Sequence, residues 1–112
     1  MLFSFLNDAF NYEERKIDRY ENGDILIDTC AISDSSHPYE TAIAHPKYND
    51  NRIIIVALYD TKEEAQKGHD NWIKVMTAEK LPESIIDVST AEVCQILDIF
   101  DNSWRKFNAQ NI

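Results

Sequence analysis

Residues 53–76 read IIIVALYDTKEEAQKGHDNWIKVM, a short apolar run that leads directly into a helix pattern. The run Ile53–Leu58 is rich in β-branched residues and too short for a buried helix, so it predicts a strand. Thr61 and Glu64 form a capping box, in which each side chain can satisfy a free backbone N–H of the first helical turn. The sequence therefore predicts a strand followed at once by a helix, which ends near residues 77–80.

The predicted helix has one apolar face, and two residues on it are unusual there. At helical spacing this face carries Ala65, Gly68, His69, Trp72, Ile73 and Met76. Gly68 costs about 1 kcal/mol relative to alanine inside a helix, which indicates a close approach of the helix backbone to the sheet. His69 has two interpretations: a structural histidine that hydrogen-bonds the sheet, or a general base or metal ligand that faces a pocket. The structural interpretation is favoured, because no second ligand follows at i+3 or i+4.

Three further strands are predicted before this unit. Asn22-Gly23 separates two alternating segments, Arg15–Glu21 and Asp24–Ser33, and this dipeptide favours a type I′ hairpin turn. Tyr39–His45 alternates as a third strand, which Pro46 ends because proline cannot continue the ladder. The connections are too short for parallel crossovers, so we expect antiparallel neighbours.

Both ends of the chain carry further apolar residues. Residues 2–10 predict a short helix or an irregular arm with the anchors Leu2, Phe3, Phe5, Leu6 and Phe10. So much exposed apolar surface favours docking on the core, with a partner-binding arm as the alternative. Ser89 and Glu92 form a second capping box, which opens a helix with the apolar face Val93, Ile96, Leu97 and Phe100.

These elements predict a single α+β domain over residues 1–112. Its centre is a four-stranded, mostly antiparallel β-meander with two main helices packed on one face. A short N-terminal helix or arm over residues 1–11 and a frayed tail over residues 103–112 complete the prediction.

Composition limits the classes of function. The chain has 112 residues, 44% of them hydrophobic, and a formal charge of -9 from 11 basic and 20 acidic residues. Such an acidic chain repels phosphates and anionic lipids, so we expect no direct nucleic-acid or membrane binding. No apolar run approaches the ~20 residues that a membrane helix needs. Cys30 and Cys94 lie in no paired-cysteine motif, which favours buried thiols in a reducing cytoplasm over a disulfide.

The sequence contains no recognisable catalytic or cofactor motif. A nucleophile elbow, a Walker loop, a dinucleotide fingerprint, a zinc knuckle and an EF-hand loop are all absent. We therefore expect no catalytic residues, no cofactor and no metal. The candidate binding residues are His45, Tyr48, Tyr59, His69 and Trp72. His45 ends a strand and would approach His69 if strand and helix flank the fourth strand, with Glu40, Asp60 or Asp70 as carboxylate partners. Amphipathic aromatic residues suit an interface or the rim of a small core.

One pattern resembles a known family. It comprises YETAIAHPKYN at residues 39–49, IIIV at 53–56, YDTKEEAQKGHDNW at 59–72 and Met76, with Asp28-Thr29 and Tyr12–Lys16 upstream. This pattern resembles a family of small proteins encoded by tailed bacteriophages and prophages, over most of the chain but not its C-terminal tail. The resemblance implies a viral origin and expression in the cytoplasm of a bacterial host, and it carries over no catalytic residues. The chain also has a weaker likeness to dimeric ferredoxin-like barrels. Its N-terminal half, however, lacks the repeated β-α-β order of those proteins.

The leading functional hypothesis is a non-enzymatic bacteriophage accessory protein that acts through protein contacts. Its partner would be a phage structural protein, in virion assembly or in the virion itself. One alternative is an anti-defence or host-takeover inhibitor, which binds a host factor or mimics DNA through its acidic side chains. Another alternative is a small-ligand-binding domain with a pocket near His69. Homo-oligomer formation is left open.

Overall fold

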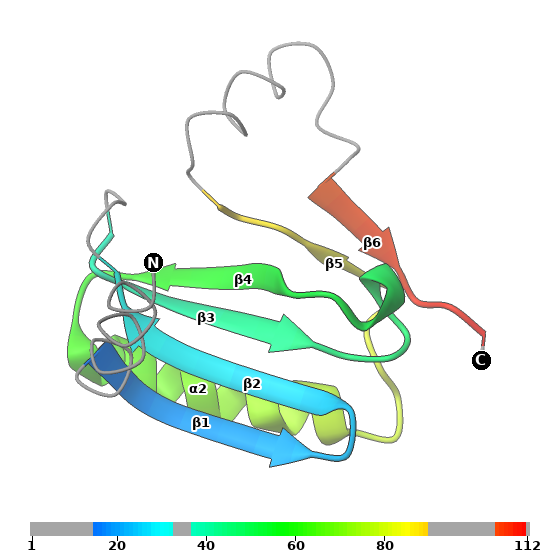
Figure 1. The fold of residues 1–112 in the computed structure, drawn as a ribbon, viewed down its shortest axis with the longest axis horizontal. Coiled ribbons are helices and arrows are strands. Elements are labelled where there is room, and N and C mark those ends of the chain that lie inside the picture. Colours follow the sequence, from blue (N-terminus) through cyan, green and yellow to red (C-terminus); the bar gives the residue numbers. More distant parts are fainter. Residues whose placement is uncertain (1–14, 33–36, 90–104, 112) are drawn as a thin grey trace, which may run out of the picture.

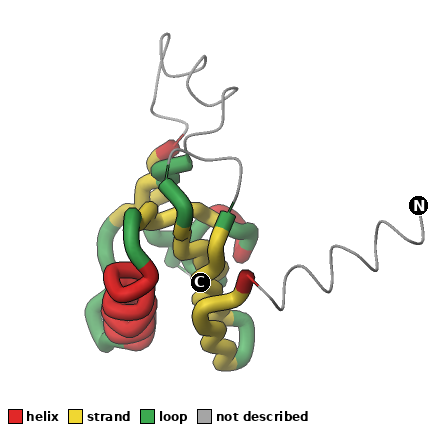
Figure 2. The backbone as a smooth tube through the Cα atoms, turned by 90° about the vertical axis from the view of Figure 1, so that its left-hand side faces the viewer, coloured by secondary structure: helices red, strands yellow, loops and turns green. Residues whose placement is uncertain are grey.

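The computed structural model describes residues 15–32, 37–89 and 105–111. Its main sheet contains the strands β1 (Lys16–Asn22), β2 (Ile25–Ala31), β3 (Tyr39–Ala44) and β4 (Ile54–Tyr59). The spatial order is β1-β2-β3-β4, and all neighbouring pairs are antiparallel. Helix α2 (Lys62–Thr77) packs on one face of this sheet, as Figures 1 and 2 show. The α+β class and the four-stranded antiparallel meander are thus confirmed.

The prediction of two main helices is not confirmed, because the described ranges contain one long α-helix. The second predicted helix, which would start at Ser89, falls on residues outside the described ranges, and so does the N-terminal helix or arm. After α2 the chain instead forms β5 (Ser84–Ile86), which pairs with β6 (Lys106–Asn108) in a separate two-stranded antiparallel sheet. Phe107 lies opposite Ile85 and packs against the core, so the described part of the tail, which we expected to fray, is held by apolar contacts.

The small sheet extends the edge of the main sheet beyond β4 (Figure 1). The backbone N–H of Val88 donates to the carbonyl oxygen of Ile55 at 2.8 Å, and that of Gln110 donates to the carbonyl oxygen of Lys47 at 2.8 Å. Between β3 and β4 lies the short 3-10 turn η1 (Asn49–Asn51), whose three residues all have positive φ angles of 51° to 63°. Asn and Asp tolerate this left-handed conformation better than other non-glycine residues.

The hairpin turn between β1 and β2 differs from the predicted type. Asn22 lies opposite Ile25, so the two-residue loop is Gly23-Asp24 rather than Asn22-Gly23. Gly23 has a φ of 60°, and Asp24 is not among the residues with positive φ. A positive φ at the first loop residue alone is the pattern of a type II′ turn, which requires glycine there.

The core lies between α2 and the sheet and reaches under β5. Its buried apolar residues are Ile27, Ile43, Tyr48, Ile54, Val56, Met76 and Ile85. The Thr61 cap also forms: the N–H of Glu64 donates to Thr61 Oγ1 at 3.1 Å, and Glu64 Oε2 accepts from the N–H of Asp60, one residue before the cap, at 3.3 Å. These bonds explain why the helix begins directly after the strand.

Candidate functional site

His69 is the end of a buried chain of polar side chains that crosses three strands. Its Nδ1 lies 2.7 Å from Thr29 Oγ1 on β2, and Thr29 Oγ1 lies 2.6 Å from Thr41 Oγ1 on β3. Thr41 Oγ1 in turn lies 3.0 Å from the hydroxyl of Tyr59 on β4. His69, Thr29 and Thr41 are all 0% exposed. The row forms because Thr29 and Thr41 face α2 at the same level of the sheet, and the Tyr59 ring, opposite Tyr39, reaches back to Thr41.

The other imidazole nitrogen of His69 faces β1. Its Nε2 lies 3.8 Å from Asp18 Oδ2 and has no hydrogen-bond partner in the described part of the chain. A carboxylate can only accept, so it favours the tautomer with the proton on Nε2. Nδ1 then accepts from Thr29, and the hydroxyl protons run in one direction, from Tyr59 through Thr41 to Thr29. Every hydroxyl in this chain thereby has a defined partner.

Asp18 is held in place by α2 rather than by a full ion pair. The side-chain amide of Gln66 donates to Asp18 Oδ2 at 3.0 Å, and the backbone N–H of Arg19 donates to Oδ1 at 2.8 Å. The Gln66 hydrogen bond is the main cause that lowers the pKa of Asp18; partial burial acts against it, and the backbone hydrogen bond from Arg19 and the charge of Lys16 act with it. Asp18 is therefore a stable anion beside His69.

Gly68 has the structural role that its helix position suggests. A Cβ atom at Gly68 would overlap the hydroxyl and ring of Tyr59. The glycine thus lets the Tyr59 ring lie against the helix backbone, where its hydroxyl reaches Thr41. Burial raises the pKa of Tyr59.

The burial of this polar chain favours the structural interpretation of His69. Asp18, His69 and Thr29 follow the order of a carboxylate, a base and a hydroxyl nucleophile. A nucleophile must meet its substrate, yet Thr29 and His69 are both 0% exposed. This row of hydrogen-bonded side chains therefore ties the helix to three strands and does not present a reacting group.

His45 lies at the far end of β3 and contacts a different set of residues. Its Nδ1 accepts from the backbone N–H of Lys47 at 3.1 Å, and its ring meets Tyr48 edge-on at 5.4 Å between centroids. Tyr48 is 0% exposed and donates its hydroxyl proton to the carbonyl oxygen of Pro82. His45 and Tyr48 thus close the β3–β4 connection. Four strand residues, or about 13 Å, separate His45 from the Thr41 level where His69 bonds, so the two histidines occupy separate sites.

The pH dependence of stability should reveal the protonation of His45. Burial, assisted by the charge of Lys47, lowers the pKa of His45 below its ordinary value of 6.5. The unfolded chain then binds the proton more readily, so stability is constant above the unfolded pKa and falls as pH drops below it. When the pH is lowered from neutral to about 5, we expect urea unfolding to show a smaller loss of stability for His45→Asn than for the natural chain. The asparagine oxygen can still accept the hydrogen bond from Lys47. Equal losses in both chains would contradict this assignment.

The remaining candidates do not join either histidine. His37 Nδ1 lies 2.7 Å from Asp60 Oδ1, and Gln66 donates to Asp70 at 3.2 Å. Trp72 is partly buried and packs against the core. Among the described residues, no group of three or more His, Cys, Asp or Glu side chains is arranged to hold a metal ion. The predicted histidine–carboxylate constellation is thus not formed by His45 and His69.

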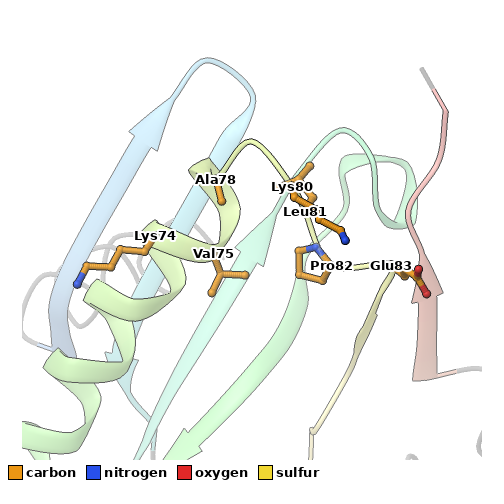
Figure 3. Close-up of a pocket in the computed structure, with 7 residues that line it drawn as sticks. All are labelled: Lys74, Val75, Ala78, Lys80, Leu81, Pro82 and Glu83. Atoms are coloured by element: carbon orange, nitrogen blue, oxygen red, sulfur yellow. The ribbon is translucent and has the colours of Figure 1, made fainter.

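Two hollows lie away from these residues. One is bounded by the end of α2 and the connection to β5, and its lining is Lys74, Val75, Ala78, Lys80, Leu81, Pro82 and Glu83 (Figure 3). The other is lined by Asn49, Asp50, Lys106, Phe107, Asn108 and Gln110. Both are open to solvent, and neither is lined by the five predicted binding residues.

The sheet face opposite α2 carries a second, uncovered group of apolar residues. Because Ile54 and Ile85 are buried in the core, the alternation of strands places their neighbours on the opposite side. We call this surface the open face. Its apolar members are Leu26, Cys30, Ala42, Ala44, Ile53, Ile55, Leu58 and Ile86, of which Ala44 is only 8% exposed. Strand register places the carboxylates of Asp28, opposite Ala42, and Glu40, opposite Cys30 and Leu58, on the same face. In Figure 1 it is turned towards the viewer, with α2 behind the sheet. No described element lies over it.

The open face has the composition of an interaction surface. Ile53 and Ile86 are 57% and 54% exposed, and they are the large hydrophobic residues most exposed in the described ranges. Charged residues lie on the face as well, and at its β1 edge Arg19 is 3.6 Å from Asp28 and 2.6 Å from Glu21. Large exposed apolar side chains are the feature that this face shares with protein–protein interfaces.

Comparisons of the chain with protein-family models, with curated proteins and with solved structures found no match. No helix in the described ranges is long and apolar enough to cross a membrane. What the chain does is therefore inferred from its own surfaces.

The sequence did not identify the residues that complete the buried polar row at His69, nor the exposed residues of the open face. Asp18, Thr29 and Thr41 carry no motif, although Thr29 and Thr41 stand among apolar residues on the inner faces of their strands. That position was the available signal, because a buried hydroxyl needs a partner. Ile53 and Ile86 could not be identified as exposed, because their neighbours in sequence are also isoleucines.

Proposed function

We propose that this chain is a non-enzymatic protein that acts through protein contacts made by the open face. The observation that carries the proposal is the exposure of two large apolar side chains, Ile53 and Ile86, on the sheet face opposite α2. Monomeric soluble proteins rarely leave a contiguous apolar patch uncovered unless it binds something. The resemblance to phage-encoded proteins adds the setting, in which the partner is a virion or assembly protein.

The alternatives receive less support from the described residues. A small-ligand pocket at His69 would need access from solvent, and His69 is 0% exposed. DNA mimicry would need an uninterrupted acidic surface. The open face instead mixes the carboxylates of Asp28 and Glu40 with apolar side chains, and positively charged Arg19 lies 3.6 Å from Asp28 at its edge.

The test is incorporation into virions of a phage that carries the gene. We expect mass spectrometry of purified virions to find the natural chain and Asn71→Asp, and to find Ile53→Asp strongly depleted. Asn71 is the matched control, because it is exposed on α2 on the other side of the sheet and receives the same added charge. In the Ile53→Asp chain the new carboxylate would be buried without a partner in the interface, which is costly.

Two results would count against the proposal. Absence of the natural chain from virions would reject the assembly role. Binding to a host protein that collapses at high salt yet tolerates Ile53→Asp would favour the acidic mimic, since screening weakens exposed charge pairs and spares apolar contacts.

A further inference from the structure

The hollow between the η1 turn and the end of β6 joins two segments that are far apart in the sequence. We call it the amide hollow, and it is lined by Asn49, Asp50, Lys106, Phe107, Asn108 and Gln110. Its volume is about 320 Å³, at the lower end of the range of about 300–1,000 Å³ that is typical of small-ligand sites. A ligand of one or two rings is therefore the size that it admits.

Backbone hydrogen bonds hold the two walls of the amide hollow together. The N–H of Gln110 donates to the carbonyl oxygen of Lys47, and the N–H of Ala109 donates to that of Glu83, both at 2.8 Å. In Figure 1 the short turn between β3 and β4 lies beside the end of β6. The walls are therefore positioned by the fold before a ligand binds, which reduces the entropy cost of binding.

The η1 wall has an unusual backbone conformation. Asn49, Asp50 and Asn51 have φ angles of 51°, 53° and 63°. Left-handed residues normally occur singly, because this conformation is unfavourable for L-amino acids. The N–H of Asn51 donates to the carbonyl oxygen of the buried Tyr48 at 3.0 Å and holds the turn. Strained backbone of this kind clusters at ligand-binding sites, which supports a binding role for the hollow that the turn lines.

The lining offers three primary amides that are available to a ligand. The side-chain amides of Asn49, Asn108 and Gln110 make no hydrogen bond within the described ranges. Each amide can donate two hydrogen bonds and accept others through its oxygen, and the Asp50 carboxylate can accept. A sugar hydroxyl both donates and accepts, so it can pair with any of these groups. Phe107 is the one apolar residue of the lining, so an apolar ligand would bury little surface here.

The charges of the lining cancel. Asp50 and Lys106 are its two charged residues, and they have opposite signs. Arg52, which is outside the lining, lies 3.7 Å from Asp50 Oδ2 and offsets this carboxylate further. The amide hollow therefore has no excess of charge that would select an ion, and its hydrogen-bonding groups favour a neutral ligand that is rich in hydroxyls.

We propose that the amide hollow binds a neutral saccharide of one or two units. The amides of Asn49, Asn108 and Gln110 pair with its hydroxyls, and the Asp50 carboxylate accepts from a hydroxyl. This site lies outside the group of apolar residues that the proposed function uses, and the inference does not rest on that function. The chain thereby has a sugar-binding site in addition to its protein-binding surface.

Titration of the isotope-labelled full chain, followed by heteronuclear NMR, tests this proposal. Glucose, galactose, mannose and N-acetylglucosamine are added separately. We expect at least one sugar to shift the side-chain amide signals of Asn49, Asn108 and Gln110 in a saturable way. The expected Kd is in the millimolar range, since a hexose has only about twelve non-hydrogen atoms. The absence of saturable shifts with all of these sugars would overturn the proposal, and so would shifts confined to other residues.

Single substitutions then assign the binding to the amides. Asn108→Ala and Gln110→Ala each remove one amide at an exposed position. We expect each to weaken sugar binding about fivefold, the factor typical of one neutral hydrogen bond. Asn71→Ala removes an exposed amide on α2, outside the lining, and should leave the Kd unchanged. The same spectra show that each variant is folded, and an unchanged Kd in both lining variants would contradict the site.

Inorganic phosphate is the comparison probe for charge. We expect phosphate to bind more weakly than the best of the sugars, because the charges of Asp50 and Lys106 cancel. Phosphate binding that is tighter than sugar binding, and that is lost in Lys106→Ala, would overturn the assignment to a neutral ligand.

Discussion

Replacing Gly68 with alanine is expected to lower the free energy of unfolding by about 2 kcal/mol, although alanine is the better helix former. Alanine returns about 1 kcal/mol through helix propensity. The added Cβ, however, would overlap the Tyr59 ring and hydroxyl. Overpacking of this kind typically costs about 1–3 kcal/mol, and a displaced Tyr59 also loses its hydrogen bond with Thr41. Urea unfolding measures the difference.

The sign of the Gly68→Ala effect should reverse when Tyr59 is removed. In a Tyr59→Ala chain the overlap is absent, so Gly68→Ala should stabilise by up to about 1 kcal/mol. Lys67→Ala is the control, because Lys67 is exposed on the same helix and should change stability by less than about 0.5 kcal/mol. A Gly68→Ala effect that is the same in both backgrounds would show that the Tyr59 contact is not the reason for the glycine.

The second large effect is expected at Thr29. Thr29→Val keeps the shape of the side chain but removes the hydroxyl that lies 2.7 Å from His69 Nδ1. His69 is 0% exposed and its Nε2 already lacks a hydrogen-bond partner in the described ranges, so the imidazole would be buried with neither nitrogen bonded. An unsatisfied buried polar group costs about 1–3 kcal/mol, which is the loss of stability we expect.

Adding His69→Leu should recover most of that loss. Replacing both partners of a buried hydrogen bond by apolar groups of similar shape is often nearly neutral, and Thr41 keeps its bond with Tyr59. We therefore expect the Thr29→Val/His69→Leu chain to lie within about 1 kcal/mol of the natural protein. Thr29→Ser retains the hydroxyl and serves as the control for the lost methyl group. A fully stable Thr29→Val single variant would contradict the structural role assigned to His69.

The β4–α2 unit and the hairpin upstream could be predicted because their signals are local. Thr61 and Glu64 mark the start of α2 within a stretch of four residues. The alternation in β2 correctly places Ile27 and Thr29 together on the buried face. The small sheet was not predicted. β5 and β6 have three residues each and meet across about twenty residues of chain, so neither contains a period long enough to recognise.

The arrangement of the candidate site residues could be predicted only in part, for a related reason. The sequence places His69 on the inner face of its helix, and the structure confirms that position with a partner on β2. Which residues meet there depends on strand register: Thr29 lies opposite Thr41, and Asp18 lies opposite Thr29. The same register keeps His45 at another level of the sheet, next to Tyr48.

The sequence by itself determined the class of fold, the strand-to-helix unit, the need for glycine at position 68 and an acidic chain without a recognisable catalytic motif. These follow from the spacing of neighbouring residues and from composition. Only the tertiary structure decided that His69 is buried and bonded to Thr29, which continues to Thr41 and Tyr59, and that Ile53 and Ile86 are exposed on the sheet face opposite α2. Burial and exposure arise from contacts between segments far apart in the chain, and no local pattern records them.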